Sequence, residues 1–457
     1  MDAKAPPPAA DALRERLLAA GVHTLLVQFT DVHGTAKGKL VPLSGLDEVL
    51  RCGAGFAGPS IWGTGLARSG PRSEYLARGD ATTAQPLPWL PGVARLVGDG
   101  WVDAQPFDAC PRQVLRRASA RLAARGWRLE VGIEPEFFLL RRRADGGYAP
   151  LDELDRLAKP SYDLKSLLRA QPLLDELRGW LGACGIDVTQ IDHEDAHGQY
   201  EVNFAHAEAL ASADRLMLFK LAAHAAAEKH GAVFSLMPKP FADQPGSGLH
   251  CHVSLWSGER NLFDAEPAAD AGAATPLPAL GERFMAGVLA HTPALCALAA
   301  PTVNSYKRLG ARDSISGTAW APLWATHGPN NRTALIRTLP GRFEWRLPDA
   351  SANPYLALAG LIAAGLDGID RALDAPPACT DDLHALADAG DAAAAQRWPR
   401  LPADLERAVD ALEANAVVSA ALGPALSTEF ARLKRAEASE AARQISLWEL
   451  ARYAEAF

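Results

Sequence analysis

Three pairs of charged or metal-binding side chains, each two residues apart, stand in apolar segments of this chain. The pairs are Glu134 and Glu136, His250 and His252, and Glu344 and Arg346. Because side chains alternate between the two faces of a β-strand, residues i and i+2 share a face. Such groups are costly to bury unless they meet a metal ion or one another. The spacing therefore predicts strands that bring these side chains together in one catalytic site.

Two further glutamates, Glu194 and Glu201, flank a glycine turn in residues 192–204. With Glu134, Glu136, Glu344 and His250 they form a set of five carboxylates and one imidazole. This set matches the oxygen-rich ligation of Mg²⁺ or Mn²⁺, and it does not match a thiolate zinc site. Two adjacent hard cations would suit phosphoryl transfer. An iron or cupin-like oxidoreductase that uses the two histidines is a weaker alternative, because that chemistry does not need five carboxylates.

Phosphate chemistry also needs cationic side chains, and residues 331–346 supply them. The segment contains Arg332, Arg337, Arg342 and Arg346, whose planar guanidinium groups can hold carboxylate or phosphate bidentately. An exposed arginine-rich hairpin is the alternative interpretation. Residues 34–40 have the wrong spacing for a P-loop and no Ser or Thr after the lysine, so we interpret them as a turn between strands. Any ATP is expected to bind through metal ions and arginines.

Composition places the chain among ordinary globular proteins. It has 457 residues, a net charge of −8 and no long basic tract, so we expect no nucleic-acid partner. The six cysteines are scattered without a paired motif, which favours a reduced, cytoplasmic protein. We expect no signal peptide, because the N-terminus lacks a basic region followed by an apolar one. We also expect no membrane contact, because the apolar stretches are too short to span a bilayer.

The pattern of elements predicts an α+β protein with two domains. We expect a disordered leader over residues 1–10, a small β-rich domain over 11–110 and a catalytic domain over 111–457. The first domain is predicted to contain a helix over 11–20 and strands over 23–30 and 36–41. In the second, a strand region over 127–141 accompanies long helices over 112–125, 166–184, 207–229, 281–299, 354–371 and 402–421. Residues 265–278 and 375–395 are predicted to be surface insertions.

Taken together, these segments resemble the glutamine synthetase family. The similarity extends from residues 29–42 to residues 447–450, and residues 237–255, 304–309 and 344–356 carry it most specifically. Within the family, residues 53–58, 237–241 and 316–322 are most similar to the enzymes called type III glutamine synthetase or γ-glutamylmethylamide synthetase. The resemblance implies a small N-terminal β-grasp domain, a larger catalytic domain, and homo-oligomeric rings, usually dodecamers, with active sites between neighbouring subunits.

The resemblance also implies roles for individual residues. Glu136, Glu194 and Glu201 would bind one Mg²⁺ or Mn²⁺ ion, and Glu134, His250 and Glu344 a second. Gly246, Arg308 and Arg346 would hold L-glutamate, while His252, Ser254, Arg337 and Arg342 would bind ATP and its transferred phosphoryl group. Arg332 and Glu344 would be catalytic. The implied reaction is attack of the glutamate γ-carboxylate on ATP to give γ-glutamyl phosphate, which an amine then displaces.

The sequence departs from the ammonium-using members at the acceptor. Ala57 stands where they carry an aspartate, and the flap over residues 310–316 has no aligned glutamate, although Asp313 could substitute. Loss of a carboxylate removes a group that would capture ammonium and leaves room for an alkyl group. We therefore expect a small primary alkylamine as acceptor. An ammonium-using glutamine synthetase is the alternative. A non-catalytic structural or regulatory member is less well supported, because every implied metal and phosphate residue is present.

Overall fold

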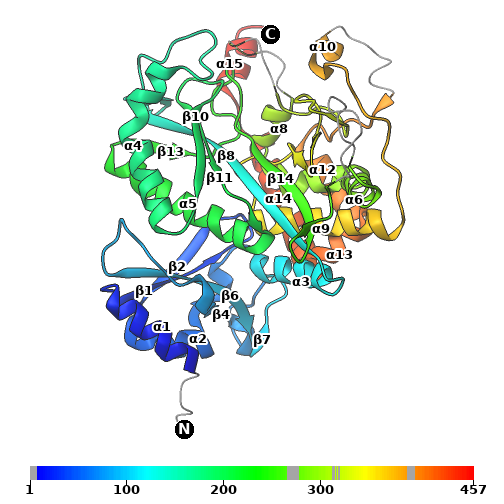
Figure 1. The fold of residues 1–457 in the computed structure, drawn as a ribbon. Coiled ribbons are helices and arrows are strands. Elements are labelled where there is room, and N and C mark those ends of the chain that lie inside the picture. The colour runs from blue at the N-terminus through cyan, green and yellow to red at the C-terminus, as the bar shows by residue number, and fades with distance from the viewer. Residues whose placement is uncertain (1–7, 265–276, 311–313, 315, 317–319, 389–396) are drawn as a thin grey trace.

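The computed structural model describes residues 8–264, 277–310, 314, 316, 320–388 and 397–457. The chain forms a small unit, blue in Figure 1, and a larger unit above it in that view. Each unit is built around one sheet, and the boundary that we predicted near residue 110 falls between the two sheets. No helix among the described residues is both long enough and apolar enough to cross a membrane.

The small unit contains a seven-stranded sheet within the described residues, in the order β2-β1-β6-β4-β3 with β5 and β7 attached to β6. Strands β1 and β6 pair in parallel, and the other pairs are antiparallel. The strands are β1 (Thr24–Thr30), β2 (Ala36–Pro42), β3 (Ala54–Ala57), β4 (Glu74–Gly79), β5 (Gln85–Pro86), β6 (Val93–Val102) and β7 (Gln105–Pro106). Residues 31–35 connect β1 and β2, so only residues 34–35 of the predicted turn 34–40 lie in this connection, and residues 36–40 belong to β2.

Two helices, α1 (Pro8–Ala19) and α2 (Leu46–Arg51), accompany the small sheet. Residues 8–10 of the predicted leader 1–10 are thus helical, and residues 1–7 lie outside the described residues. A proline can open a helix because the first N–H needs no intrahelical partner. Leu13 and Leu17 of α1 are buried in the same core as Leu25 and Val27 of β1.

The larger unit contains an eleven-stranded sheet within the described residues, in the order β10-β11-β8-β14-β18-β17-β16. Strands β9, β12 and β13 attach to β8, and β15 attaches to β14. The strands are β8 (Arg128–Arg142), β9 (Tyr148–Pro150), β10 (Val188–His193), β11 (Gln199–Phe204), β12 (Ala207–Glu208), β13 (Val233–Ser235), β14 (Leu249–Ser257), β15 (Arg260–Asn261), β16 (His327–Pro329), β17 (Ile336–Leu339) and β18 (Arg342–Trp345). The predicted region 127–141 is thus the single long strand β8, which crosses the unit diagonally in Figure 1.

Helices cover the larger sheet, and nearly all residues of α9 are buried. Its glycine Gly368 lies so close to α6 that an added Cβ would sit 2.1 Å from the Arg283 carbonyl oxygen. The described helices are α3 (Pro111–Ala123), α4 (Leu164–Ala183), α5 (Ala209–Lys229), α6 (Ala279–Ala290), α7 (Thr292–Ala299), α8 (Ser305–Leu309), α9 (Pro354–Asp370), α10 (Leu383–Asp388), α12 (Leu405–Ala414), α13 (Ala416–Leu422), α14 (Pro424–Ala442) and α15 (Leu447–Tyr453).

Two predicted helices are each divided in the structure. The region 281–299 becomes α6 and α7 because Pro293 lies in the first turn of α7, where it cannot continue the preceding hydrogen-bond ladder. The region 402–421 becomes α12 and α13 because Asn415 is extended and its side chain accepts a hydrogen bond from the Val418 N–H. Of the predicted insertions, residues 265–276 and 389–395 lie outside the described residues.

A buried arginine joins the two units. Arg112 of α3 is 3% exposed and forms ion pairs with Asp80 and Asp99 of the small unit at 3.0 and 2.8 Å. It also pairs with Asp214 of α5 at 2.7 Å, and the Tyr355 hydroxyl donates to the same carboxylate at 2.7 Å. Burial alone would raise the pKa of Asp80, but hydrogen bonds from Thr82 and the charge of Arg112 lower it to about 2. The network thus holds ionised carboxylates at the junction of the units.

Candidate functional site

The strand register places the predicted ligands in rows across one face of the larger sheet. It pairs Glu136 with Glu201, Glu134 with His250, and His252 with Glu344. Residues directly opposite one another in antiparallel strands have neighbouring side chains on the same face. The i,i+2 spacing within each strand and the pairing between strands therefore gather these side chains into one site, as the sequence predicts. Behind the sheet, Phe137 of β8 packs against Phe219 of α5.

One group of carboxylates consists of Glu136, Glu194 and Glu201, with one oxygen of each within 4.8 Å of the others. Glu194 follows directly after β10, whereas the other two lie on β8 and β11. Burial raises the pKa of Glu136 to about 7, although the Gly248 N–H and nearby arginines act in the opposite direction. Burial and neighbouring carboxylates also raise the pKa of Glu194 and of Glu201 well above the usual range. A divalent cation would relieve this concentration of negative charge, so the donor set fits a hard metal ion.

The second group overlaps the first along the sheet. Ligand atoms of Glu134, His252 and Glu344 lie within 4.8 Å of one another, and so do those of Glu134, Glu201 and His250. His252 Nε2 lies 3.1 Å from Glu134 Oε1, and His250 Nδ1 lies 3.5 Å from Glu344 Oε1. The structure thus brings the predicted set of Glu134, His250 and Glu344 together, and it adds His252 beside them. Which histidine binds a cation stays a prediction.

Glu344 is the most heavily paired carboxylate of the site. Arg337 Nη1 lies 2.9 Å from its Oε2, and Arg346 donates to its Oε1. Burial alone would raise the pKa of Glu344, but Arg346, the two histidines and Arg337 lower it to about 2. Glu344 is therefore ionised throughout the physiological range, whereas protons compete with a cation at Glu136. Among the described residues, Arg332 is not an ion partner of Glu344. It is exposed between β16 and β17.

Two cavities meet this face of the sheet. A narrow one is lined by Gly246 and Arg308, which are predicted to bind the substrate L-glutamate, and by Glu136 and Glu194. The Arg308 guanidinium is 3% exposed and donates to the carbonyl oxygens of Leu347 and Arg346 at 3.0 and 3.2 Å. A wider one, of about 480 Å³, is lined by the predicted ATP residues His252, Ser254 and Arg342 together with Glu134. The Arg342 Nε donates to His252 Nδ1 at 3.1 Å. The ligand groups thus lie between the two cavities.

Several residues outside the predicted set contact it or line the same cavity. The Gln199 amide donates to Glu136 Oε2 at 3.1 Å, and the Asn203 amide donates to Glu134 Oε1 at 3.1 Å. Both flank Glu201 with the i,i+2 spacing that identifies the other site residues, so the signal is present in the sequence. Asp195 and Trp320 also line the narrow cavity, and neither lies in a strand, so the i,i+2 rule does not identify them. Asp313, which could replace the flap glutamate, lies outside the described residues.

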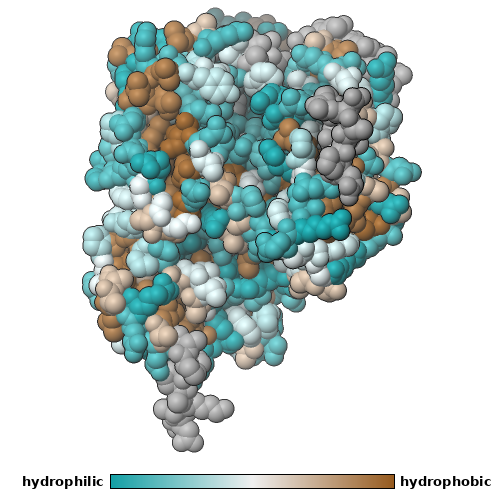
Figure 2. Space-filling model, in the orientation of Figure 1, coloured by the Kyte–Doolittle hydropathy of each residue, from teal (hydrophilic) through white to brown (hydrophobic). Residues whose placement is uncertain are grey.

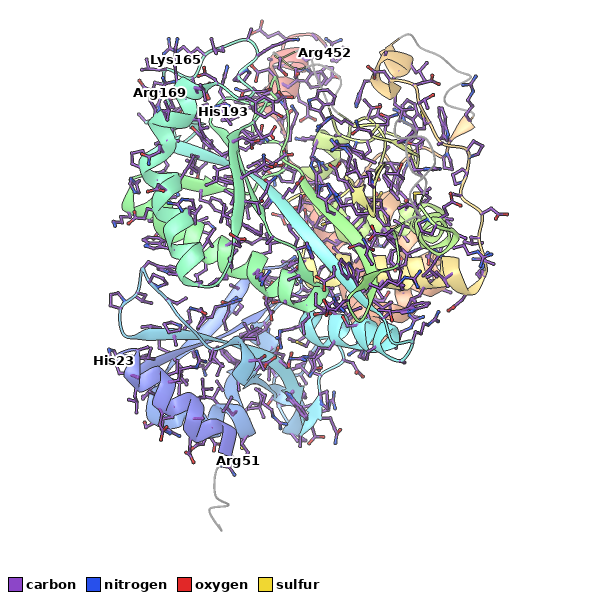
Figure 3. All side chains as sticks on the ribbon, viewed as in Figure 1. His23, Arg51, Lys165, Arg169, His193 and Arg452 are labelled. Atoms are coloured by element: carbon purple, nitrogen blue, oxygen red, sulfur yellow. The ribbon has the colours of Figure 1, made fainter. Side chains whose placement is uncertain are left out.

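A buried carboxylate, Asp155, holds both ends of the β10–β11 turn. His193 Nε2 lies 2.8 Å from Asp155 Oδ2, and both side chains have no exposed surface. The same carboxylate oxygen accepts the Gly198 N–H at 2.7 Å. Figure 3 shows His193 in the part of the molecule where Lys165 and Arg169 of α4 lie. Glu194 is thus held by a buried neighbour rather than by a flexible loop.

We predict that metal-free protein loses stability as the pH rises. A carboxyl whose pKa is raised in the folded state contributes stability below its unfolded pKa, and it loses that contribution as the pH rises through the folded pKa. For Glu136, raised from 4.5 to about 7, the loss is on the order of 3 kcal/mol. Thermal unfolding with chelator between about pH 5 and about pH 8 should show a falling Tm, which saturating Mg²⁺ restores. Glu136→Gln should reduce the dependence, and an unchanged slope would contradict the assignment.

The chain is similar to known proteins over nearly all of its length. The glutamine synthetase catalytic domain matches residues 108–453. The glutamate–methylamine ligase of Methyloversatilis universalis is 45% identical over 95% of this chain and 97% of its own length. The glutamine synthetase of Rhizobium leguminosarum bv. phaseoli is 38% identical over 93% of this chain and 94% of its own. A solved complex of GmaS with ADP superimposes with a TM-score of 0.88 at 38% identity, over 97% of this chain and 99% of that chain.

These relatives cover nearly the whole chain, so the similarity includes both units of the structure. The predicted α+β class, with a small N-terminal β-grasp domain before a larger catalytic domain, is confirmed. The predicted family resemblance is confirmed as well. The chain therefore belongs to the glutamine synthetase family of glutamate ligases.

Proposed function

We propose that this protein joins the γ-carboxylate of L-glutamate to a small primary alkylamine, with ATP converted to ADP and phosphate. The observation that carries the proposal is the position of the two anionic ligand groups. They lie between the narrow cavity, lined by residues predicted to hold the substrate glutamate, and the wider cavity, lined by residues predicted to bind ATP. A γ-carboxylate and a terminal phosphate bound from opposite sides would meet at these groups. The expected intermediate is γ-glutamyl phosphate, which the amine displaces.

The metal ligands in this proposal are the five predicted carboxylates and one histidine. Glu136, Glu194 and Glu201 would hold one Mg²⁺ or Mn²⁺ ion, and Glu134, Glu344 and a histidine, either the predicted His250 or His252 beside it, would hold another. Bound there, hard divalent cations neutralise charge on phosphate oxygens. The protein's own contribution is to keep the carboxylates in place, since Gln199 and the Gly248 N–H both bind Glu136 Oε2.

Arginines would bind the two anionic substrates, glutamate and ATP. Arg346 is 4% exposed, and its Nε has no hydrogen-bond partner among the described residues, so it has a donor left for the carboxylate of glutamate. Arg308 and Gly246 line the same region. On the nucleotide side, Arg337 and Arg342 extend from β17 and β18 beside His252 and Ser254. Arg332 stands on the exposed turn before β17, from which a long side chain can reach a phosphate.

The acceptor is the part of the proposal that an experiment decides most directly. Support for an alkylamine comes from Ala57, which ends β3 where ammonium-using members carry an aspartate, and from the relative that ligates glutamate to methylamine. We predict a higher kcat/KM for methylamine or ethylamine than for ammonium. The measurement is ADP release with glutamate, Mg²⁺ and each of ammonium, methylamine, ethylamine, ethanolamine and putrescine. A highest kcat/KM for ammonium would make the protein a plain glutamine synthetase, and no ADP release with any acceptor would favour a non-catalytic member.

We also propose that the protein forms homo-oligomeric rings in the cytoplasm. Hydrophobic side chains remain exposed on the C-terminal segment, where Leu447 is 85% and Trp448 62% exposed. A second exposed group comprises Leu154, Leu157, Tyr162, Leu164 and Leu168, before and at the start of α4. Figure 2 shows hydrophobic residues gathered over the α4 side of the molecule. Large exposed apolar surfaces of this kind favour association with further copies. The six free cysteines support a reducing compartment.

A further inference from the structure

A carboxylate and an indole that no metal or phosphate role uses stand side by side in the narrow cavity. Asp195 lies on the β10–β11 turn directly after Glu194, and Trp320 lies more than a hundred residues later in the chain. The Trp320 Nε1–H donates to Asp195 Oδ2. Both side chains line the cavity that also contains Glu136, Glu194 and Arg308. They therefore face the same space as the group of ligands next to which the γ-carboxylate would react.

Both residues are held in place by the surrounding structure. The turn that carries Asp195 is fixed by the hydrogen bond of the Ala196 N–H to Gln199 Oε1 at 3.0 Å and by that of the His197 N–H to the buried Gln244 at 2.8 Å. The Trp320 carbonyl oxygen accepts a hydrogen bond from Arg346 at 3.4 Å. The indole is 41% exposed, so part of its surface remains open to a ligand. Hydrogen bonds to the surrounding structure thus hold both residues in the lining of the cavity.

An alkylammonium ion presents two features to a binding site, a charged N–H group and a small apolar group. A carboxylate accepts the N–H bonds, and an aromatic face attracts both the cation and the alkyl carbon. On the basis of the proposed function, we propose that Asp195 and Trp320 form the acceptor subsite, in which Asp195 binds the amine nitrogen and Trp320 contacts its alkyl group. Asp195 would then take over the charge pairing that Ala57 cannot supply, and Trp320 would make the site favour an alkylamine over ammonium.

The competing explanation is that Asp195 only adds negative charge near the metal ligands. Asp192 provides a matched control for this possibility, because Asp192 and Asp195 both raise the pKa of Glu194. Asp192 is half-buried like Asp195, but it does not line the narrow cavity. Removing either charge changes the field at Glu194, whereas only Asp195 can contact an acceptor. Asp195→Asn and Asp192→Asn are therefore compared in the full-length protein.

The first experiment measures kcat/KM for methylamine and for hydroxylamine, which is mostly uncharged near neutral pH. We expect Asp195→Asn to lower kcat/KM for methylamine by about 10- to 100-fold, as for a lost hydrogen bond to a charged group. The value for hydroxylamine and the KM for glutamate should stay close to wild type, and Asp192→Asn should not discriminate between the acceptors. Equal losses for both acceptors in Asp195→Asn, or the same discrimination in Asp192→Asn, would overturn the assignment of Asp195.

The second experiment tests the indole. Trp320→Ala should reduce the preference for methylamine over ammonium by about fourfold, as expected when one methyl group loses its apolar contact. Trp320→Phe keeps an aromatic surface and should retain most of the preference. An unchanged preference in Trp320→Ala would overturn the role of the indole. If the wild-type enzyme itself favours ammonium, the proposed alkylamine function fails, and the selective loss of ammonium use in Asp195→Asn, with hydroxylamine again as reference, still decides the role of Asp195.

Discussion

Replacing Glu194 by alanine should abolish ADP release while leaving the protein folded. The residue contributes one of three carboxylates to a group in which Glu136 raises the pKa of Glu194, and Glu194 raises that of Glu201, so its loss weakens cation binding at that group. Since a bound metal ion contributes several kcal/mol of charge stabilisation, we expect a loss of several orders of magnitude in kcat. The metal-free variant should melt at a higher temperature than metal-free wild type near neutral pH, because a repelling charge is gone.

Activity, cation binding by calorimetry and thermal unfolding measure these three effects together. Glu259→Ala is the matched control, because Glu259 is an exposed carboxylate at the turn between β14 and β15. It should change none of the three quantities. Near-wild-type activity of the Glu194 variant at limiting Mg²⁺ would remove this residue from the ligand set, and a collapse of its Tm would show a structural role instead.

Replacing Arg112 by leucine should strongly destabilise the folded protein. The substitution leaves Asp80, Asp99 and Asp214 at the junction of the two units without the cation that pairs with all three. Removing one partner of a buried ion network typically costs about 3–5 kcal/mol. We therefore expect a marked fall in the urea midpoint of unfolding.

Arg117→Leu on the same helix is the control. Arg117 is half-buried and pairs with the exposed Asp108 at 3.5 Å, and a solvent-accessible pair of this kind contributes about 0–1 kcal/mol. An equal effect of the two substitutions would mean that loss of helix propensity or solubility, and not the buried network, explains the result. A stable Arg112 variant with the two units uncoupled would instead give two separate unfolding transitions.

The chemistry of the site could be predicted because its residues stand at i,i+2 spacing in short apolar segments. Glu134 and Glu136, or His250 and His252, share a face as soon as their segment is a strand, and apolar neighbours on both sides indicate those strands. Burial of carboxylates in a globular chain also implies a cation or a partner. The alternation therefore predicts the ligand face without any knowledge of which strands pair.

Other features depend on the tertiary structure and have no local signal. Asp195 lies in a turn, where the i,i+2 spacing does not define a common face, and its neighbour Trp320 comes from a segment far along the chain. Both His250 and His252 lie beside the second ligand group because of the register in which β14 pairs with β8 and β18. The ends of helices differ from the prediction where one residue decides the outcome, as Asn415 does by capping α13 in the middle of an otherwise helical pattern.

The distribution of ligands over the sheet has a consequence for the order of folding. Glu134 and His250 face each other only when β14 has paired with β8, and His252 meets Glu344 only when β18 has paired with β14. These contacts join segments that are distant in sequence, so their loop-closure entropy is paid late in folding. A cation therefore has no assembled ligand set to bind in early intermediates. Metal binding should therefore slow the unfolding of the folded protein, and it should have little effect on the folding rate.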